Sequence, residues 1–229
     1  MTGNQVKKVF YDLGAEFCGI ASIDRFDKAP KGFHPTSVMP SCKSVISYGC
    51  RIPISALMTD NKHVYTFIRD KLTQKLNDIA LEASLKLEQM GMIVLPLECN
   101  DSVYDADTDR YRSLISAKHA AQAAGVGSIG RNTLLITPEF GSMVWLGSVL
   151  TNAELEPDPL IDSICDGCNI CVEACPVNAL ESEVIKQWTC HGNAFDDNDE
   201  IICHKCRDVC PYCFGTKNKI LCDEISRGK

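Results

Sequence analysis

The carboxyl-terminal third of the chain concentrates its cysteines, and cysteine thiolates at short, regular spacings bind metals. Eight of them lie between residues 165 and 210: Cys165, Cys168, Cys171, Cys175, Cys190, Cys203, Cys206 and Cys210. Three thiolates at intervals of three residues can wrap around three corners of a cubic 4Fe–4S cluster. The fourth, Cys175, precedes a proline, and in proteins with two clusters the fourth cysteine of such a run binds the other cluster.

A second cysteine run repeats the ending of the first. Cys203, Cys206 and Cys210 again end before a proline, but the run lacks its first cysteine, for which Cys190 is the substitute. We therefore predict two 4Fe–4S clusters. The predicted ligands are Cys165, Cys168, Cys171 and Cys210 for one cluster, and Cys175, Cys190, Cys203 and Cys206 for the other.

Structural zinc and disulfide bonds are the alternatives for these cysteines. Two Cys-x-x-Cys pairs at modest separation also suit a tetrahedral zinc site. Zinc, however, explains neither the third cysteine at the same spacing nor the proline after each closing cysteine. Disulfides are disfavoured because no secretory signal precedes the cysteines. Cys213 and Cys222 are not needed as ligands, and the scattered cysteines are expected to be small buried apolar groups: Cys18, Cys42, Cys50 and Cys99.

Composition narrows the class of protein. The 229 residues, 45% hydrophobic and 23% charged, are enough for one sizeable core with a small appended domain. A formal net charge of −7 argues against a broad nucleic-acid-binding face. The amino terminus lacks the apolar run of a signal peptide, and no stretch approaches the roughly 18 apolar residues of a membrane span. We expect a cytoplasmic protein in a reducing setting, with no membrane partner.

Apolar periodicity predicts the elements that must position the cysteines. The clearest signal is a long helix over 61–90, with apolar residues every three or four positions and with Asp60 or Asn61 as the cap. Its apolar stripe is expected to pack in the core and to have no functional role. The other expected elements are helices over 6–17 and 116–124 and strands over 18–23, 44–49, 93–97, 133–137 and 142–150.

Two further segments could carry function. Residues 100–112 form a polar stretch rich in reactive side chains, either a functional loop or a solvated surface loop. Residues 125–130 read Gly-x-Gly-x-x-Gly, but a helix precedes them and a strand follows, the reverse of the order in a dinucleotide-binding fingerprint. A nicotinamide site is therefore rejected. The glycines either let the backbone approach a large flat ligand or form a tight turn.

A shift in composition suggests a domain boundary. Residues 151–162 combine acidic residues with two prolines, as linkers do. We predict one domain over residues 1–155 and a second, cysteine-rich domain over 156–229.

Three parts of the sequence resemble a known family. Residues 40–46, residues 118–142 and the eight-cysteine segment, in that order, resemble the epoxyqueuosine reductases, relatives of the reductive dehalogenases. The resemblance implies an α+β fold, in which a nitroreductase-like α/β sandwich domain that holds cobalamin is followed by a bis-4Fe–4S ferredoxin-like domain. It implies cobalamin-binding roles for residues around the glycine turn: Gly125, Gly127, Ser128, Gly130, Arg131 and Asn132.

The resemblance also implies where substrate chemistry would occur. Tyr111, Lys118 and His119 are the expected catalytic residues. Tyr111 lies near the place where those enzymes carry a proton-donating aspartate, and its ordinary pKa of about 10 makes it a different acid. The full-length enzymes carry a further helical-repeat region that helps to hold tRNA, and this sequence ends at Lys229 without one. We therefore expect a short relative for which tRNA is a possible but not the favoured substrate.

These features predict an iron–sulfur redox protein. It would pass single low-potential electrons through two 4Fe–4S clusters to cobalamin, acting as a cobalamin-dependent reductase supplied by an external donor of the ferredoxin or flavodoxin type. The first alternative is an electron-transfer protein with no substrate chemistry of its own, including one that reduces a corrinoid held by a partner protein. The second is a zinc-stabilised binding module.

Overall fold

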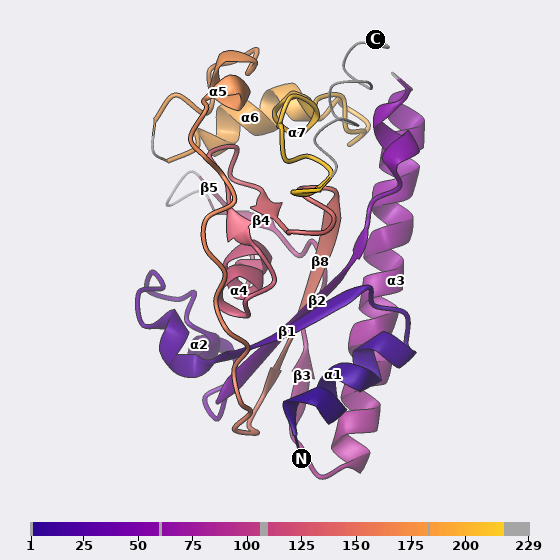
Figure 1. The fold of residues 1–229 in the computed structure, drawn as a ribbon, viewed down its shortest axis with the longest axis vertical. Helices are drawn as coiled ribbons and strands as arrows, with labels where there is room; N and C mark the ends of the chain where they lie inside the picture. Colours follow the sequence, from indigo (N-terminus) through magenta and orange to yellow (C-terminus); the bar gives the residue numbers. More distant parts are fainter. Residues whose placement is uncertain (1, 60, 106–109, 183, 218–229) are drawn as a thin grey trace.

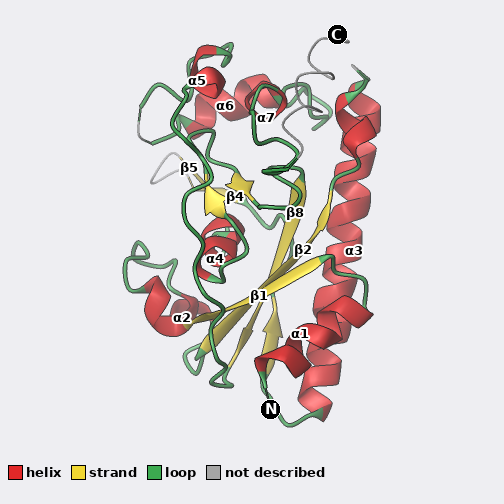
Figure 2. Ribbon diagram, viewed as in Figure 1, coloured by secondary structure: helices red, strands yellow, loops and turns green. Residues whose placement is uncertain are grey.

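A four-stranded antiparallel sheet forms the centre of the molecule (Figures 1 and 2). The structure is a computed structural model that describes residues 2–59, 61–105, 110–182 and 184–217. The strands lie in the order β1-β2-β8-β3 and span Phe17–Ser22 (β1), Ser44–Arg51 (β2), Val144–Thr151 (β8) and Val94–Pro96 (β3). Seven of the eight residues of β2 are buried, because this strand has neighbours on both edges and helices on both faces.

The long helix α3 (Lys62–Gln89) covers one face of the sheet together with α1 (Gly3–Asp12). The side chain of Asn61 caps α3 by accepting a hydrogen bond from the His63 N–H at 3.0 Å, as predicted. In this core the Tyr48 hydroxyl donates to the Leu76 carbonyl at 2.9 Å. Four residues of the predicted stripe are buried here: Leu76, Ile79, Ala83 and Leu87. Val64 and Met90, at the two ends of the stripe, were expected in the core but are exposed.

The opposite face of the sheet carries a smaller layer. It contains α4 (Ala117–Ala123) and α2 (Pro35–Val38), with a short 3-10 turn at Ile23–Phe26. A second 3-10 turn, Ile54–Leu57, belongs instead to a cluster with Tyr65 of α3 and Cys213 of the cysteine-rich end. Alternate side chains of β2 point to opposite faces, so Ile46 packs in the α3 core while Val45 packs with Ala120 of α4. The predicted helix over 116–124 is confirmed within one residue at each end.

The predicted helix over 6–17 is found at Gly3–Asp12, and Phe17 belongs to β1. Two further predicted segments differ from the structure. Residues 100–112 were expected to form a loop, but β4 (Val103–Asp105) and β5 (Arg110–Arg112) pair there as antiparallel strands. The predicted strand over 133–137 is confined to β7 (Leu135–Ile136), which pairs with β6 (Ser128–Ile129) inside the glycine segment. In both places the pairing partner, rather than the local apolar pattern, decides where the strand lies.

The cysteine-rich segment has little regular structure. Its helices are short and lie together at one end of the molecule (Figure 1): α5 (Ile170–Glu173), α6 (Gln187–Ala194) and α7 (Lys205–Asp208). The predicted linker has no regular structure and is tied to the sheet domain. Asp158 accepts a hydrogen bond from the Ile20 N–H at 2.9 Å and forms an ion pair with Lys7.

The thirteen cysteines in the described part of the chain form no disulfide bond with one another. Cys42, Cys50 and Cys99 are buried, as expected, whereas Cys18 is partly exposed. Cys222 lies outside the described residues. None of the described helices is long and apolar enough to cross a membrane.

Candidate metal centre

The first predicted group of cysteines lines one small hollow. Cys165, Cys168, Cys171 and Cys210 all border it, together with residues of the glycine segment and Tyr212. Burial raises the pKa of the Cys171 thiol, and the nearby Cys165 and Cys168 raise it further. Burial, followed by the effect of the other three cysteines, raises the pKa of Cys210 to about 11. The structure thus brings the closing cysteine of the second run to the first.

The second predicted group gathers in the same way. Burial raises the pKa of the Cys190 thiol, and Cys175 and Cys203 add to the effect. The pKa of Cys206 rises to about 12, again mainly through burial, with Cys190 and Cys203 contributing and the Arg207 guanidinium opposing. In each group, therefore, the cysteines influence one another electrostatically. Cys175 is the last cysteine of the first run, but it lies with the second group.

The four cysteines that line the hollow supply the donor set of a 4Fe–4S cube, in which every corner iron takes its own thiolate. Among the described residues, no group of three or more His, Cys, Asp or Glu side chains is arranged about a single metal ion. Backbone N–H groups donate to sulfur atoms in both groups. Arg131 N–H donates to Cys165 Sγ at 3.4 Å, and Ala179 N–H donates to Cys175 Sγ at 3.3 Å. Such bonds stabilise the charge on ligating sulfur. The ligand assignment itself stays a prediction.

The glycines near this hollow are needed for close packing of the chain on itself. Gly125 has φ +70, and a Cβ there would lie 2.2 Å from the Pro159 carbonyl oxygen. At Gly127 a Cβ would lie 2.5 Å from the Ile136 carbonyl oxygen. A Cβ on Gly130 would lie 2.7 Å from the Ile136 side chain. The tight-turn alternative therefore accounts for these glycines.

Polar side chains of the same segment hold the cysteine-rich segment in place. Ser128 Oγ accepts from the Ile164 N–H at 2.9 Å, and Asn132 Nδ2 donates to the Cys206 carbonyl at 3.1 Å. The Arg131 guanidinium donates to the carbonyls of Ser182 and Glu181. These groups are therefore bonded to the chain itself. Their predicted role in binding cobalamin has no support from this geometry.

The predicted catalytic residues lie at and before the start of α4. Lys118 Nζ donates to the Thr133 carbonyl at 2.9 Å, and burial lowers the pKa of Lys118. His119 Nδ1 lies 2.7 Å from the Ser116 hydroxyl, and burial, with a contribution from Lys118, lowers the pKa of His119. The backbone of Tyr111 belongs to β5, but its side chain lies outside the described residues. Their catalytic roles stay predictions.

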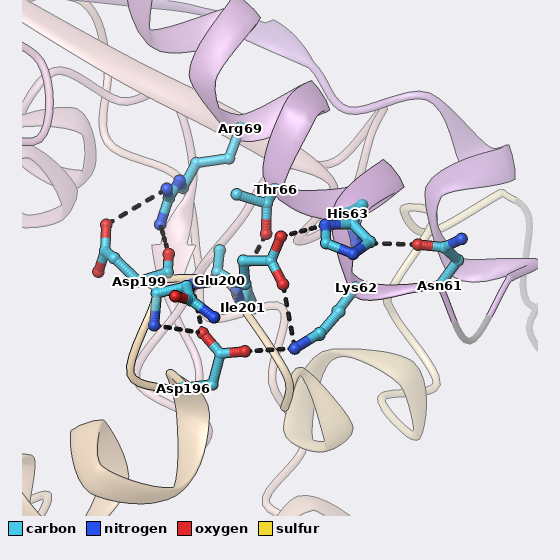
Figure 3. A network of polar contacts seen from close by, with 10 residues as sticks. Asn61, Lys62, His63, Thr66, Arg69, Asp196, Asp199, Glu200 and Ile201 are labelled. Atoms are coloured by element: carbon cyan, nitrogen blue, oxygen red, sulfur yellow. Dashed lines mark hydrogen bonds and ion pairs between the residues drawn. The ribbon is translucent and has the colours of Figure 1, made fainter.

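The sequence analysis missed a polar contact between α3 and the cysteine-rich segment (Figure 3). Lys62 forms ion pairs with Asp196 and Glu200, and His63 Nδ1 contacts the second Glu200 oxygen. Further along the helix, Thr66 Oγ1 accepts from the Ile201 N–H at 3.0 Å, and Arg69 donates to the Asp199 carbonyl at 3.1 Å. These contacts fix the segment that leads into Cys203. The sequence signal for this contact was the pair of opposite charges: a basic start of α3 and an acidic run over 196–200.

Known proteins with similar sequences match parts of this chain. A family model described as a 4Fe-4S binding domain matches residues 159–181, which contain the first cysteine run. An epoxyqueuosine reductase from Bacillus cereus is 32% identical over 155 residues, which make up 66% of this chain and 39% of that enzyme. The chain thus corresponds to well under two thirds of that relative's length.

Solved structures show the same fold. A crystal structure of epoxyqueuosine reductase with an epoxyqueuosine-modified tRNA stem loop has a TM-score of 0.65 at 22% identity, covering 94% of this chain and 65% of that one. A reductive dehalogenase studied for B12-dependent dehalogenation has a TM-score of 0.70 at 17% identity, covering 95% of this chain and 33% of that one. The chain is therefore an epoxyqueuosine reductase-like protein with a 4Fe–4S binding domain, related in fold to the reductive dehalogenases and spanning part of the length of those enzymes.

Proposed function

We propose that the chain binds two 4Fe–4S clusters and delivers single electrons through them to a corrinoid, as an oxidoreductase resembling epoxyqueuosine reductase. The observation that supports this most is the gathering of the eight cysteines into two neighbouring groups, with the closing cysteine of each run in the other group. A bound cluster supplies one-electron chemistry at a potential that its surroundings tune. In this proposal residues 1–155 form the nitroreductase-like domain and 156–229 the bis-cluster domain.

The surroundings of the two groups suggest how the chain supports electron transfer. Cys168 is the exposed member of the eight, so the first group reaches the surface, where an external donor of the ferredoxin or flavodoxin type can approach. Asn132 and Arg131 join both groups to the glycine segment. These contacts hold the two groups close to each other and to the sheet domain.

The corrinoid acceptor is supported by similarity alone. The dehalogenase of the same fold is described for B12-dependent chemistry, and corrinoid binding by this chain is carried over from that relation. A second candidate function is an electron-transfer protein that reduces a corrinoid held by a partner. The bonding of Ser128, Arg131 and Asn132 to the chain itself favours this candidate.

Metal content of protein purified without oxygen tests the clusters. We expect about eight irons per chain and a broad absorbance at about 400 nm that bleaches with dithionite. Cys171→Ser and Cys206→Ser should each lose about half of the iron, because each removes a ligand from a different group. Cys99→Ser is the control, since that thiol donates to the Leu146 carbonyl away from both groups. Zinc in place of iron, or full iron in both ligand variants, would contradict the assignment.

Retention of added cobalamin separates the two candidate functions. Protein incubated with hydroxocobalamin should keep corrin absorption bands through gel filtration if the chain holds the corrinoid itself. Complete loss of the corrin bands, with the iron retained, would instead favour a corrinoid-carrying partner. The iron measurement shows whether the protein remained intact.

A further inference from the structure

A buried arginine lies beside the second cysteine group without a counter-ion. Arg207 follows Cys206 in α7, and only 8% of its surface is exposed. Its Nη1 donates to the Tyr65 hydroxyl. In the part of the chain that the structure describes, the guanidinium forms no ion pair with a carboxylate, and its buried Nε has no hydrogen-bond partner. Burying a guanidinium is costly unless a negative charge compensates it.

Tyr65 fixes the position of this charge. It lies in the first turns of α3, is 5% exposed, and stacks on the His204 ring at a centroid distance of 4.6 Å. His204 Nδ1 in turn lies 2.7 Å from Asp208 Oδ1, so that carboxylate is engaged with the imidazole. The neutral Tyr65 hydroxyl can orient the guanidinium but cannot neutralise it. The adjacent cysteine group becomes an anionic partner for this guanidinium when its thiolates hold a cluster.

The two cysteine groups differ in whether a buried cationic side chain lies beside them. Backbone N–H groups bond to sulfur in both groups, among them Arg131 N–H to Cys165 in the first and Ala179 N–H to Cys175 in the second. The Arg131 guanidinium is turned to the carbonyls of Glu181 and Ser182, whereas the Arg207 guanidinium is buried next to Cys206. A cluster bound by four thiolates is anionic and becomes more negative on reduction, so a nearby buried cation favours its reduced state.

We propose that Arg207, held by Tyr65, is the counter-charge of the second cysteine group and raises the reduction potential of the cluster bound there. The proposal rests on the proposed function, because it needs a cluster in that group. It assigns Arg207 and Tyr65 a positioning role, acting on the cluster through charge and not through contact with substrate.

The test is an EPR-monitored redox titration of the anaerobically purified holoprotein. In Arg207→Gln the ratio of reduced to oxidised second cluster, at a fixed potential, should fall about tenfold, which corresponds to about 59 mV for a one-electron couple. Arg207→Lys keeps the charge and should restore most of that loss. Lys205→Gln is the matched control: it removes a cation that also neighbours Cys206 but is exposed, so water screens it and the ratio should change less than about twofold.

Iron content separates failure of this inference from failure of the proposed function. Wild-type protein without iron would refute the clusters themselves. Arg207→Gln with full iron and two unchanged potentials, or an equal shift in Lys205→Gln, would overturn the role of Arg207. If Arg207→Gln lost its clusters, Tyr65→Phe would provide the test instead. That variant keeps the cation but removes the hydroxyl that holds the guanidinium in place. Unchanged reduction potentials in Tyr65→Phe would then overturn the proposal.

Discussion

At the scale of single residues, Gly125 shows how much of the site depends on close backbone packing. Its φ of +70 lies in the left-handed region, and the Pro159 carbonyl occupies the space that a Cβ would need. Ser128 of the same segment holds Ile164, immediately before Cys165. The path of the chain into the first cysteine run therefore depends on a residue without a side chain.

Gly125→Ala should destabilise the fold by clearly more than the left-handed conformation alone costs. That conformation costs an L-residue about 1–2 kcal/mol, and the overlap with Pro159 adds to it. Gly91→Ala is the matched control, because Gly91 has φ +88 and a methyl group added there would meet no other atom within 4 Å. Denaturant unfolding of both variants checks the prediction, and equal losses of unfolding free energy would show that the overlap is relieved.

At the scale of elements, α3 serves both parts of the molecule. Its later turns supply core residues to the sheet, and its first turns contact the segment that leads into Cys203 (Figure 3). The Lys62 ammonium lowers the pKa of Asp196 to about 2. Since the folded-state pKa lies below the ordinary value, this ion pair stabilises the contact above the ordinary pKa and is lost as the pH falls through about 2.

Asp196→Asn should loosen residues 196–201 from α3. Hydrogen exchange of that segment should be faster in the variant by the same factor across about pH 5–8, because the carboxylate is fully charged throughout that range. Asp197→Asn is the control, since Asp197 is an exposed neighbour in the same acidic run. If the ratio of the exchange rates in the variant and the wild-type protein changed between about pH 5 and 8, another titrating group would govern the contact.

At the scale of the whole molecule, the two ends differ in what stabilises them. The sheet domain has a core of its own, with Phe10, Tyr48 and Leu87 fully buried between α1, the sheet and α3. The cysteine-rich end has helices of only four to eight residues, and such short helices are not stable by themselves. The clusters proposed for this end would therefore add to the stability of its fold.

Removal of iron with a chelator should therefore open residues 163–213 and leave the sheet intact. Limited proteolysis or hydrogen exchange before and after chelation measures this directly. Strands β2 and β8 should keep their protection, while the segment around Cys190 and Cys206 should lose it. Loss of protection in the strands at the same rate would mean that the molecule unfolds as one unit.

The sequence by itself determined the features that depend on local spacing. Apolar runs located the sheet strands and α3 to within a few residues, because burial imposes its period directly on the sequence. The intervals within each cysteine run similarly indicated which thiols share a loop. The strand pairing of residues 103–112 was missed, because a polar segment forms a strand only where a partner fixes its register.

Only the tertiary structure decided which distant groups meet. The contacts of Lys62 with Asp196 and of Tyr65 with Arg207 join residues more than a hundred positions apart. Helical periodicity shows which residues share a face but not what covers that face, so the apolar period of α3 did not identify the segment that its first turns contact. The glycine segment was expected to approach a ligand or to turn tightly, and the structure shows the chain's own carbonyls there, because a missing Cβ permits either kind of close approach.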